Sequence, residues 1–465
     1  MGKPSPERER SGEEVRALME WAVDNRKRPL REDVRRRAAL ILADDIGAMV
    51  AGSQEKQVAG AQANVIRDSA NRPEAHVFAA GAPLCDRTTA AAANGLSVTW
   101  CELDEGFRNA SCHAGAYTLP TLLAEAEANG HSVEEVLRHL AIAYEVTTRF
   151  ALAFPFPRFN VHPHAAFATI GAAAAAAISR GLDAPSMLRA ICGAASMTYA
   201  GHFDTAVEGA LVRNAWTGVG AWIGLRSADW SELGIGGLPT GPFDTFVDCV
   251  GTEYRPGAML DQLGERWSVT NGYHKIFACC GYAHSAVEAT LELLGRLQGG
   301  RTVDDVESVE VATGPGGQTL TTVKPETVLA AKFSIPHSVA ATMVIGDAGR
   351  RAFIEDTLSD TRIARLREAV KLSLHPNIQP WPKDRPAIVT WRFRDGESWQ
   401  ASCDNARGGA DQPFGDDALF DKLRDNCETV FPAMPRLLWA IVDGDAGVLS
   451  HKWADYARVL TESRT

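Results

Sequence analysis

The chain has 465 residues, of which 45% are hydrophobic and 23% charged, and its formal net charge at pH 7 is −11. This length favours two domains, and the composition is that of a folded globular protein rather than a collagen, a coiled coil or a disordered chain. The negative charge argues against a nucleic-acid partner, because binding to phosphates needs a basic face.

Other features of the sequence bear on where the protein is located and whether it binds a metal. The apolar run at 170–178 is far shorter than the roughly 20 residues of a membrane span, and the N-terminus lacks the apolar region of a secretory signal. Pro6 stands where a myristoylation signal has Ser or Thr. The nine cysteines are irregularly spaced and contain no CxxC pair. This pattern argues against zinc and iron–sulfur sites and predicts a reduced, cytoplasmic protein with no membrane partner.

Helix-forming patterns dominate the chain from about residue 12 to residue 265. Residues 12–52 predict two amphipathic helices, the second of them capped by Asp33. An alanine-rich segment follows at 87–98, in which the Asn94-Gly95 pair predicts a turn.

Strong helix boundaries come next. Pro120 is expected to begin a helix that ends at Gly130. Ser132 and Glu135 then form a capping box for a long helix. Two further helices rich in small residues are predicted at 165–180 and 185–200.

The pattern changes near residue 265. Alternating β-branched residues predict strands at 306–314 and a hairpin at 386–404, and helices are predicted between them, at 284–298, 336–346 and 358–371. The tail at 416–442 is again helical in pattern. The sequence therefore predicts a mainly α fold with a smaller α+β domain, residues 267–404, and a chain that returns to the helical domain.

Four polar clusters lie where short loops meet helices rich in small residues, at 103–113, 159–164, 212–218 and 271–284. Their arginine and lysine side chains suit carboxylate recognition, and their histidines suit proton transfer near neutral pH. The chain contains no P-loop, no GxGxxG opening a helix and no GxSxG elbow, which argues against phosphate-cradling and serine-hydrolase chemistry.

Several motifs resemble those of the MmgE/PrpD family, in the same order and over nearly the whole chain. They are ELDEG, HAGAYTLPTLLAEAEANG, RFNVHPH, TIGAAAAAA, VRNAWTGVGA, HKIFACCGYAH and AKFSIPHSVA. The family includes 2-methylcitrate dehydratases, cis-aconitate decarboxylases and iminodisuccinate epimerases. The resemblance implies a large all-helical domain built from both chain ends, 1–266 and 405–465, with an inserted α/β lid domain at 267–404. It also implies a homodimer that needs no metal or organic cofactor.

The resemblance implies a set of site residues. Three match catalytic positions of the family: His113, His162 and Lys275. Five more are expected to bind substrate: Asp104, Arg213, His164, Cys280 and His284.

One of these residues departs from the family pattern. Arg213 stands where many members have a lysine, and a guanidinium holds a carboxylate but is not a plausible proton donor. For Cys280 the resemblance gives no preferred residue type; a thiol can hydrogen-bond or exchange a proton, but its reference pKa suits pH 7 less well than that of an imidazole. A standard cis-aconitate decarboxylase is therefore not expected.

The hypothesis is a cofactor-independent lyase that acts on a small di- or tricarboxylic acid by moving a proton at the carbon next to a carboxylate. His113 and His162 would transfer the proton, one as base and one as acid, while Lys275 and Arg213 stabilise the developing charge. Asp104 would orient a histidine. Two alternatives remain open: an epimerase that uses the same site, and a non-catalytic metabolite-binding member of the family.

Some of these residues have a structural interpretation as well. Lys275 is alternatively a solvated surface cation, and Arg213 alternatively stacks on Trp216. Asp104 and Glu105 are alternatively an ordinary acidic pair facing solvent at a helix N-terminus.

The histidines and the cysteine also have structural alternatives. His113 would cap a following helix, and His162 would be a hydrogen-bonded loop histidine. Cys280 is more simply a buried small side chain, and His284 has a structural role at the start of its helix.

Overall fold

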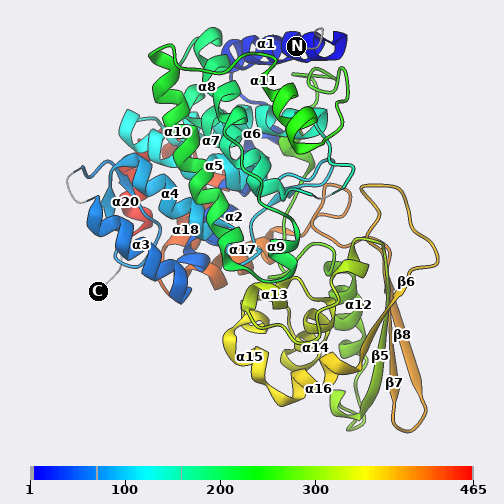
Figure 1. Ribbon diagram of the computed structural model, residues 1–465. Coiled ribbons are helices and arrows are strands. Elements are labelled where there is room, and N and C mark those ends of the chain that lie inside the picture. Colours follow the sequence, from blue (N-terminus) through cyan, green and yellow to red (C-terminus); the bar gives the residue numbers. More distant parts are fainter. Residues whose placement is uncertain (1–4, 70–71, 159, 463–465) are drawn as a thin grey trace.

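Most of the chain is α-helix, arranged as a large helical part and a smaller part that carries a four-stranded sheet (Figure 1). The computed structural model describes residues 5–69, 72–158 and 160–462. The predicted fold class, mainly α with a smaller α+β part, is confirmed. Met1 and Gly2, on which the signal and lipid predictions depend, lie outside the described residues, as does Phe159 of the polar cluster at 159–164.

The helical part is formed mainly by nine longer helices and two short ones. Their bounds are α1 Pro6–Asn25, α2 Glu32–Ser53, α3 Lys56–Asp68, α4 Arg87–Val98, α5 Ala114–Asn129, α6 Val133–Ala153, α7 Pro163–Ser179, α8 Ala184–Ser196, α9 Asp204–Val207, α10 Trp216–Glu232 and α11 Gly241–Phe243. Two short strands, β1 Ala75–His76 and β2 Leu84–Cys85, pair with each other. The predicted capping box of Ser132 and Glu135 is present, and Gly130 ends α5 in the left-handed conformation.

Three predicted boundaries are wrong. Asn94 and Gly95 lie inside α4 rather than in a turn, because the Asn94 side chain hydrogen-bonds to the backbone of residues 76 and 78. Helix α5 begins at Ala114, six residues before Pro120, and the backbone N–H of Gly115 in its first turn donates to the Glu105 carboxyl.

The third wrong boundary is at the start of α2. Arg31, rather than Asp33, occupies the N-cap position of this helix. Asp33 lies in the first turn, where its carboxylate accepts from the Arg31 guanidinium at 2.8 Å.

Helices α7 and α10 pack closely because small residues face each other along their contact. A Cβ atom added at Gly224 of α10 would lie 2.4 Å from the Ala172 Cβ of α7, and one at Gly220 would lie 2.5 Å from the Ala168 Cβ. Contacts this short need glycine, so the alanine-rich sequence of α7 and the glycines of α10 together set the distance between the two helices.

Replacing Gly224 with alanine is expected to lower the free energy of unfolding by about 1–3 kcal/mol, because the added methyl overpacks the α7–α10 contact. Urea denaturation measures this loss. Gly60→Ala in α3 is the matched control, since no atom lies within 4 Å of its added Cβ. That control should raise stability by about 0.5–1 kcal/mol through helix propensity. Equal effects of the two changes would contradict the packing explanation.

The smaller part contains a mixed sheet covered by helices. Its strands are β5 Val306–Thr313, β6 Val370–Leu374, β7 Ala387–Phe393 and β8 Ser398–Cys403, in the spatial order β6-β5-β7-β8. Only β5 and β6 run parallel. Its helices are α12 His284–Gly295, α13 Val328–Lys332, α14 Ile335–Ile345, α15 Glu355–Ser359 and α16 Thr361–Ala369. Alternate residues of β7 are buried, as the period-2 pattern predicts for a strand with one face on the core.

The last helices pack against the first ones. They are α17 Asp416–Cys427, α18 Met434–Asp443, α19 Ala446–Ser450 and α20 Trp453–Leu460, drawn in orange and red beside the blue N-terminal helices (Figure 1). Helices α17 and α18 contact α2, and a buried ion pair joins Lys422 of α17 to Asp44 of α2. The domain boundaries at 266/267 and 404/405 stay predictions.

Across the described ranges, no helix combines the length and the apolarity that crossing a membrane requires.

Candidate functional site

A cavity of about 70 Å³ lies where the helical part meets the smaller part. The helical part contributes residues from 102–113, 162–163 and 203–213 to its lining, and the smaller part contributes residues from 273–282 together with Phe333 and Arg385. Five of the residues predicted from the sequence are in this lining: His113, His162, Arg213, Lys275 and Cys280. The structure thus brings all four polar clusters to one place.

A short strand pair holds the first and last of these clusters together. Strand β3 (Gly106–Phe107) pairs antiparallel with β4 (Gly272–Tyr273). A Cβ atom at Gly106 would lie 2.7 Å from the Tyr273 ring, so only glycine permits this pairing. The Phe107 N–H also donates to the Cys112 carbonyl at 2.7 Å, which closes the loop that presents His113.

His113 is held in one tautomer. It occupies the N-cap position of α5, but its side chain makes no capping bond. Its Nδ1 lies 2.7 Å from Oδ2 of Asp104 and 2.9 Å from the Glu105 carbonyl oxygen. Because a carbonyl only accepts, Nδ1 carries a proton and donates. The other nitrogen, Nε2, is then the one left to act as a base.

Asp104 and Lys275 are buried together beneath His113. Their side chains are 0% and 1% exposed, so their interpretations as solvated surface charges are wrong, and Glu105 is equally buried. The Lys275 Nζ lies 3.7 Å from an Asp104 oxygen. Burial opposes the charge of Asp104, but Lys275 and His113 outweigh that effect and lower its pKa. Asp104 and Glu102 likewise raise the pKa of Lys275 against burial, so the ammonium keeps its charge.

Glu102 is central to the charged network of the cavity, although the sequence analysis assigns no role to it. Its carboxylate lies between two cations, 2.5 Å from Nη2 of Arg213 and 3.3 Å from Nζ of Lys275. Burial opposes its charge, but Arg213 and Lys275 lower its pKa to about 2. The three groups form a buried ion network in the wall of the cavity.

The backbone at Glu102 is strained, with φ at 56°, which is rare for a residue other than glycine. Two buried lysines from other elements hold this turn in place. Lys332 donates to the Trp100 carbonyl at 2.8 Å, and Lys422 donates to the Leu103 carbonyl at 2.6 Å. Such strain persists where neighbouring contacts fix it, as it does at many functional sites.

Arg213 uses most of its donors within the protein. It lies in a 3₁₀ turn, Leu211–Ala215. Its Nη1 donates to the Thr99 carbonyl at 3.2 Å and to the Asn214 side chain at 2.9 Å. Its guanidinium lies 5.4 Å from the centre of the Phe333 ring, so stacking on Phe333 replaces the alternative of stacking on Trp216.

His162 is buried and neutral at neutral pH. It caps α7, where its Nδ1 accepts from the His164 N–H at 3.1 Å, and its Nε2 faces Nε of Arg213 at 3.4 Å. Donors therefore face both ring nitrogens and disfavour a second ring proton. Burial, followed by the charge of Arg213, moves the pKa of His162 well below 6.5.

Three of the predicted residues lie behind the lining rather than in it. His164 is fully buried between His113 and His162 and shares a 2.8 Å hydrogen bond with the Tyr117 hydroxyl. His284 donates from Nε2 to the Cys279 carbonyl at 3.1 Å, and burial lowers its pKa to about 3. The third is Asp104, which acts on the cavity through His113 and Lys275.

A second acidic pair lies under the histidine loop. Glu105 accepts from the Gly115 N–H at 2.9 Å and from the Tyr144 hydroxyl at 3.0 Å, while its own N–H donates to Asp45 at 3.0 Å. Burial is the main cause that raises the pKa of Glu105 to about 8. Burial and the charge of Glu105 also raise the pKa of Asp45.

This pair predicts a pH dependence of stability. A carboxyl whose folded pKa is about 8, against an unfolded value of 4.5, stabilises fully below pH 4.5 and loses that contribution as the pH rises to 8. Glu105→Gln should therefore gain stability relative to the native chain between pH 5 and pH 8, measured by urea denaturation. The exposed Glu134→Gln is the control. A Glu105→Gln difference that stays constant over this range would contradict the raised pKa.

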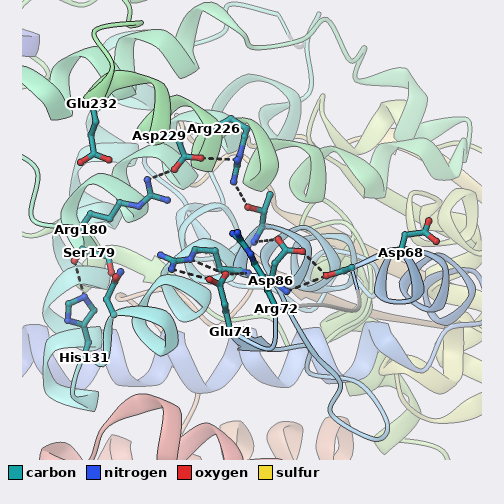
Figure 2. Close-up of a pocket in the computed structure, with 14 residues that line it drawn as sticks. Asp68, Arg72, Glu74, Asp86, His131, Ser179, Arg180, Arg226, Asp229 and Glu232 are labelled. Atoms are coloured by element: carbon teal, nitrogen blue, oxygen red, sulfur yellow. Dashed lines mark hydrogen bonds and ion pairs between the residues drawn. The ribbon is translucent and has the colours of Figure 1, made fainter.

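A larger depression, of about 960 Å³, lies among α4, α5, α7 and α10 (Figure 2). Several of its charged groups are paired with one another: Asp229 pairs with both Arg180 and Arg226, and Glu74 pairs with Arg87. None of the residues predicted from the sequence lines it. The smaller cavity, where histidines and cations converge, is therefore the candidate site.

Within the described part of the chain, no three His, Cys, Asp or Glu side chains converge in a way that could hold a metal ion.

Comparisons of the sequence with known proteins find matches along most of its length. The model of the MmgE/PrpD N-terminal domain matches residues 16–248, and that of the MmgE/PrpD C-terminal domain matches residues 277–443. The second match extends past residue 404 into helices α17 and α18. The chain is also 25% identical to a cis-aconitate decarboxylase-like protein, oryM, of Aspergillus oryzae over 439 residues, which cover 88% of this chain and 89% of that protein. The two family matches span most of the sequence, and the chain belongs to the MmgE/PrpD family.

Proposed function

We propose that this protein is a lyase that acts on a small di- or tricarboxylic acid by removing a proton from the carbon next to a carboxylate. Membership of the MmgE/PrpD family supports a lyase-like role. The observation that carries the specific proposal is His113, whose Nδ1 donates to Asp104 while the ring lines a cavity that also contains Lys275.

This geometry suits a base. Nε2 of His113 takes the proton, and the adjacent Asp104 carboxylate stabilises the imidazolium that forms. The electron pair left on the carbon spreads into the substrate carboxylate, where the charge of Lys275 stabilises it. The imidazolium then returns the proton, either to a leaving hydroxyl or to carbon.

His162 has a different part in this scheme from the one expected from the sequence. The hypothesis gave one histidine the role of acid, but the lowered pKa of His162 makes an imidazolium costly at neutral pH. A neutral His162 would position Arg213, which faces it at 3.4 Å, rather than transfer a proton.

The volume of the cavity, about 70 Å³, favours a short acid. Loss of water and reprotonation on the opposite face both begin with this enolate-like species, so an epimerase, which also needs a proton donor on that opposite face, remains the second candidate. Loss of CO₂ differs, because breaking the C–C bond itself leaves the electron pair on carbon, and that carbon then takes a proton. A non-catalytic member would bind the same acids without converting them. The homodimer, the cytoplasmic location and activity without a cofactor remain predictions from the sequence and the resemblance.

A substrate screen tests the proposal. Short hydroxylated and unsaturated di- and tricarboxylates would be incubated with the protein and followed by proton NMR. A new alkene, consumption of an alkene or release of CO₂ supports the lyase, whereas inversion at the carbon without an alkene supports the epimerase. Acids that raise the melting temperature by mass action but stay unchanged would indicate the binding protein. If no acid binds or reacts, the proposal is wrong.

A further inference from the structure

Arg385 is a buried cation in the cavity wall that the scheme above does not use. It precedes strand β7, and its side chain is 11% exposed. Its guanidinium donates no hydrogen bond to any described residue. Its buried Nε makes only an ion-pair contact, at 3.7 Å from the Asp384 carboxylate. A buried guanidinium with free donors is unusual, because desolvation is costly unless an anion balances it.

The other two cations of the lining are already balanced. Arg213 and Lys275 share the Glu102 carboxylate, and Lys275 also faces Asp104. These two cations and two carboxylates carry no net charge together. Arg385 faces one carboxylate, that of Asp384 at 3.7 Å, and donates no hydrogen bond to it. Its guanidinium donors are therefore free to bind an anionic ligand in the cavity.

The surroundings of Arg385 hold its guanidinium in place. It lies 4.4 Å from the centre of the Tyr282 ring and 5.1 Å from that of Trp381. A Cβ atom at Gly281 would lie 2.9 Å from its Nη1, so the glycine leaves the space that this group occupies. A fork of donors held against two aromatic rings is preorganised for a carboxylate, which it can bind through two parallel hydrogen bonds.

We propose that Arg385 binds a second carboxylate of the substrate, away from the reacting carbon, and so selects dicarboxylates over monocarboxylates. This inference rests on one part of the proposed function, namely that the cavity binds the carboxylic-acid substrate. Lys275 then binds the carboxylate next to the reacting carbon. Arg385 binds the carboxylate at the far end of the substrate.

Binding of matched acids tests this inference. Succinate and butyrate share four carbons but differ by one carboxylate, and glutarate and valerate form a second pair. Calorimetric titration of the native chain should give tighter binding of each dicarboxylate than of its partner. Arg385→Gln should weaken dicarboxylate binding at least about tenfold, which is the loss of one charged contact worth 1.4 kcal/mol, and change monocarboxylate binding less than about twofold.

Two further variants guard against indirect effects. Gly281→Ala displaces the guanidinium without removing it and should weaken dicarboxylate binding in the same direction. Arg392→Gln removes an exposed arginine of the same part of the chain and should change nothing. If Arg385→Gln binds succinate and glutarate as the native chain does, the inference is wrong while the proposed function stands. If the native chain binds no short acid, both fail.

Discussion

His113→Asn should lower the turnover number on the acid identified by the screen by about 10²–10⁴-fold, the usual contribution of a general base. Asparagine is chosen because its side-chain amide can take the place of Nδ1 and donate to Asp104, which preserves the contact at 2.7 Å. The variant loses only Nε2. It should therefore fold normally and bind the acid with little change in affinity.

His202→Asn is the matched control, because this histidine is 57% exposed and lies outside the cavity lining. It should retain the native turnover number. Circular dichroism and the melting temperature check that both variants are folded. A folded His113→Asn variant with native turnover would remove the residue from the mechanism.

Glu102→Gln should lower the free energy of unfolding by about 3 kcal/mol or more, since removing one member of a buried ion network leaves the remaining charges uncompensated. Two cations depend on this carboxylate, Arg213 at 2.5 Å and Lys275 at 3.3 Å. The same change should abolish turnover or reduce it strongly, because both cations belong to the cavity lining. Urea denaturation at pH 7 measures the loss of stability.

Acid pH and a second variant separate the charge effect from a packing effect. Since the folded pKa of Glu102 is about 2 and the unfolded value is 4.5, its contribution is present above pH 4.5 and is lost as the pH falls towards 2. The native chain should lose more stability over that interval than Glu102→Gln. Adding Lys275→Met to Glu102→Gln removes one uncompensated cation and should restore part of the loss. If the loss of unfolding free energy in the double variant exceeds the sum of the losses in the two single variants, this explanation is contradicted.

Local patterns were sufficient to predict much of the helical part. The capping box at Ser132 and the glycine end of α5 are determined by neighbours within a few residues, and both are confirmed. The start of α5 was misplaced because it depends on Glu105, whose carboxyl accepts from the Gly115 N–H. The turn predicted at Asn94 failed for the same reason, since its partners come from a neighbouring segment.

The site residues also divide into those that local motifs predict and those that depend on tertiary contacts. His113, His162 and Lys275 belong to motifs that the sequence displays, and all three line the cavity. Glu102 was part of a quoted motif, two residues before Asp104, and only its position between two cations shows its importance.

Arg385 belongs to no quoted motif and reaches the cavity through the tertiary fold. The strand pair β3–β4, two residues on each side, is too short to give a pattern of its own. Both features depend on contacts between segments far apart in the chain, which a single sequence does not display.

The most direct test of the central claim is exchange of the substrate proton with solvent. The native protein in deuterated water should place deuterium on the carbon next to the carboxylate of the identified acid, and the folded His113→Asn variant should do so at least about a hundred times more slowly. Exchange at the native rate in that variant would show that another group removes the proton and would contradict the assignment of His113.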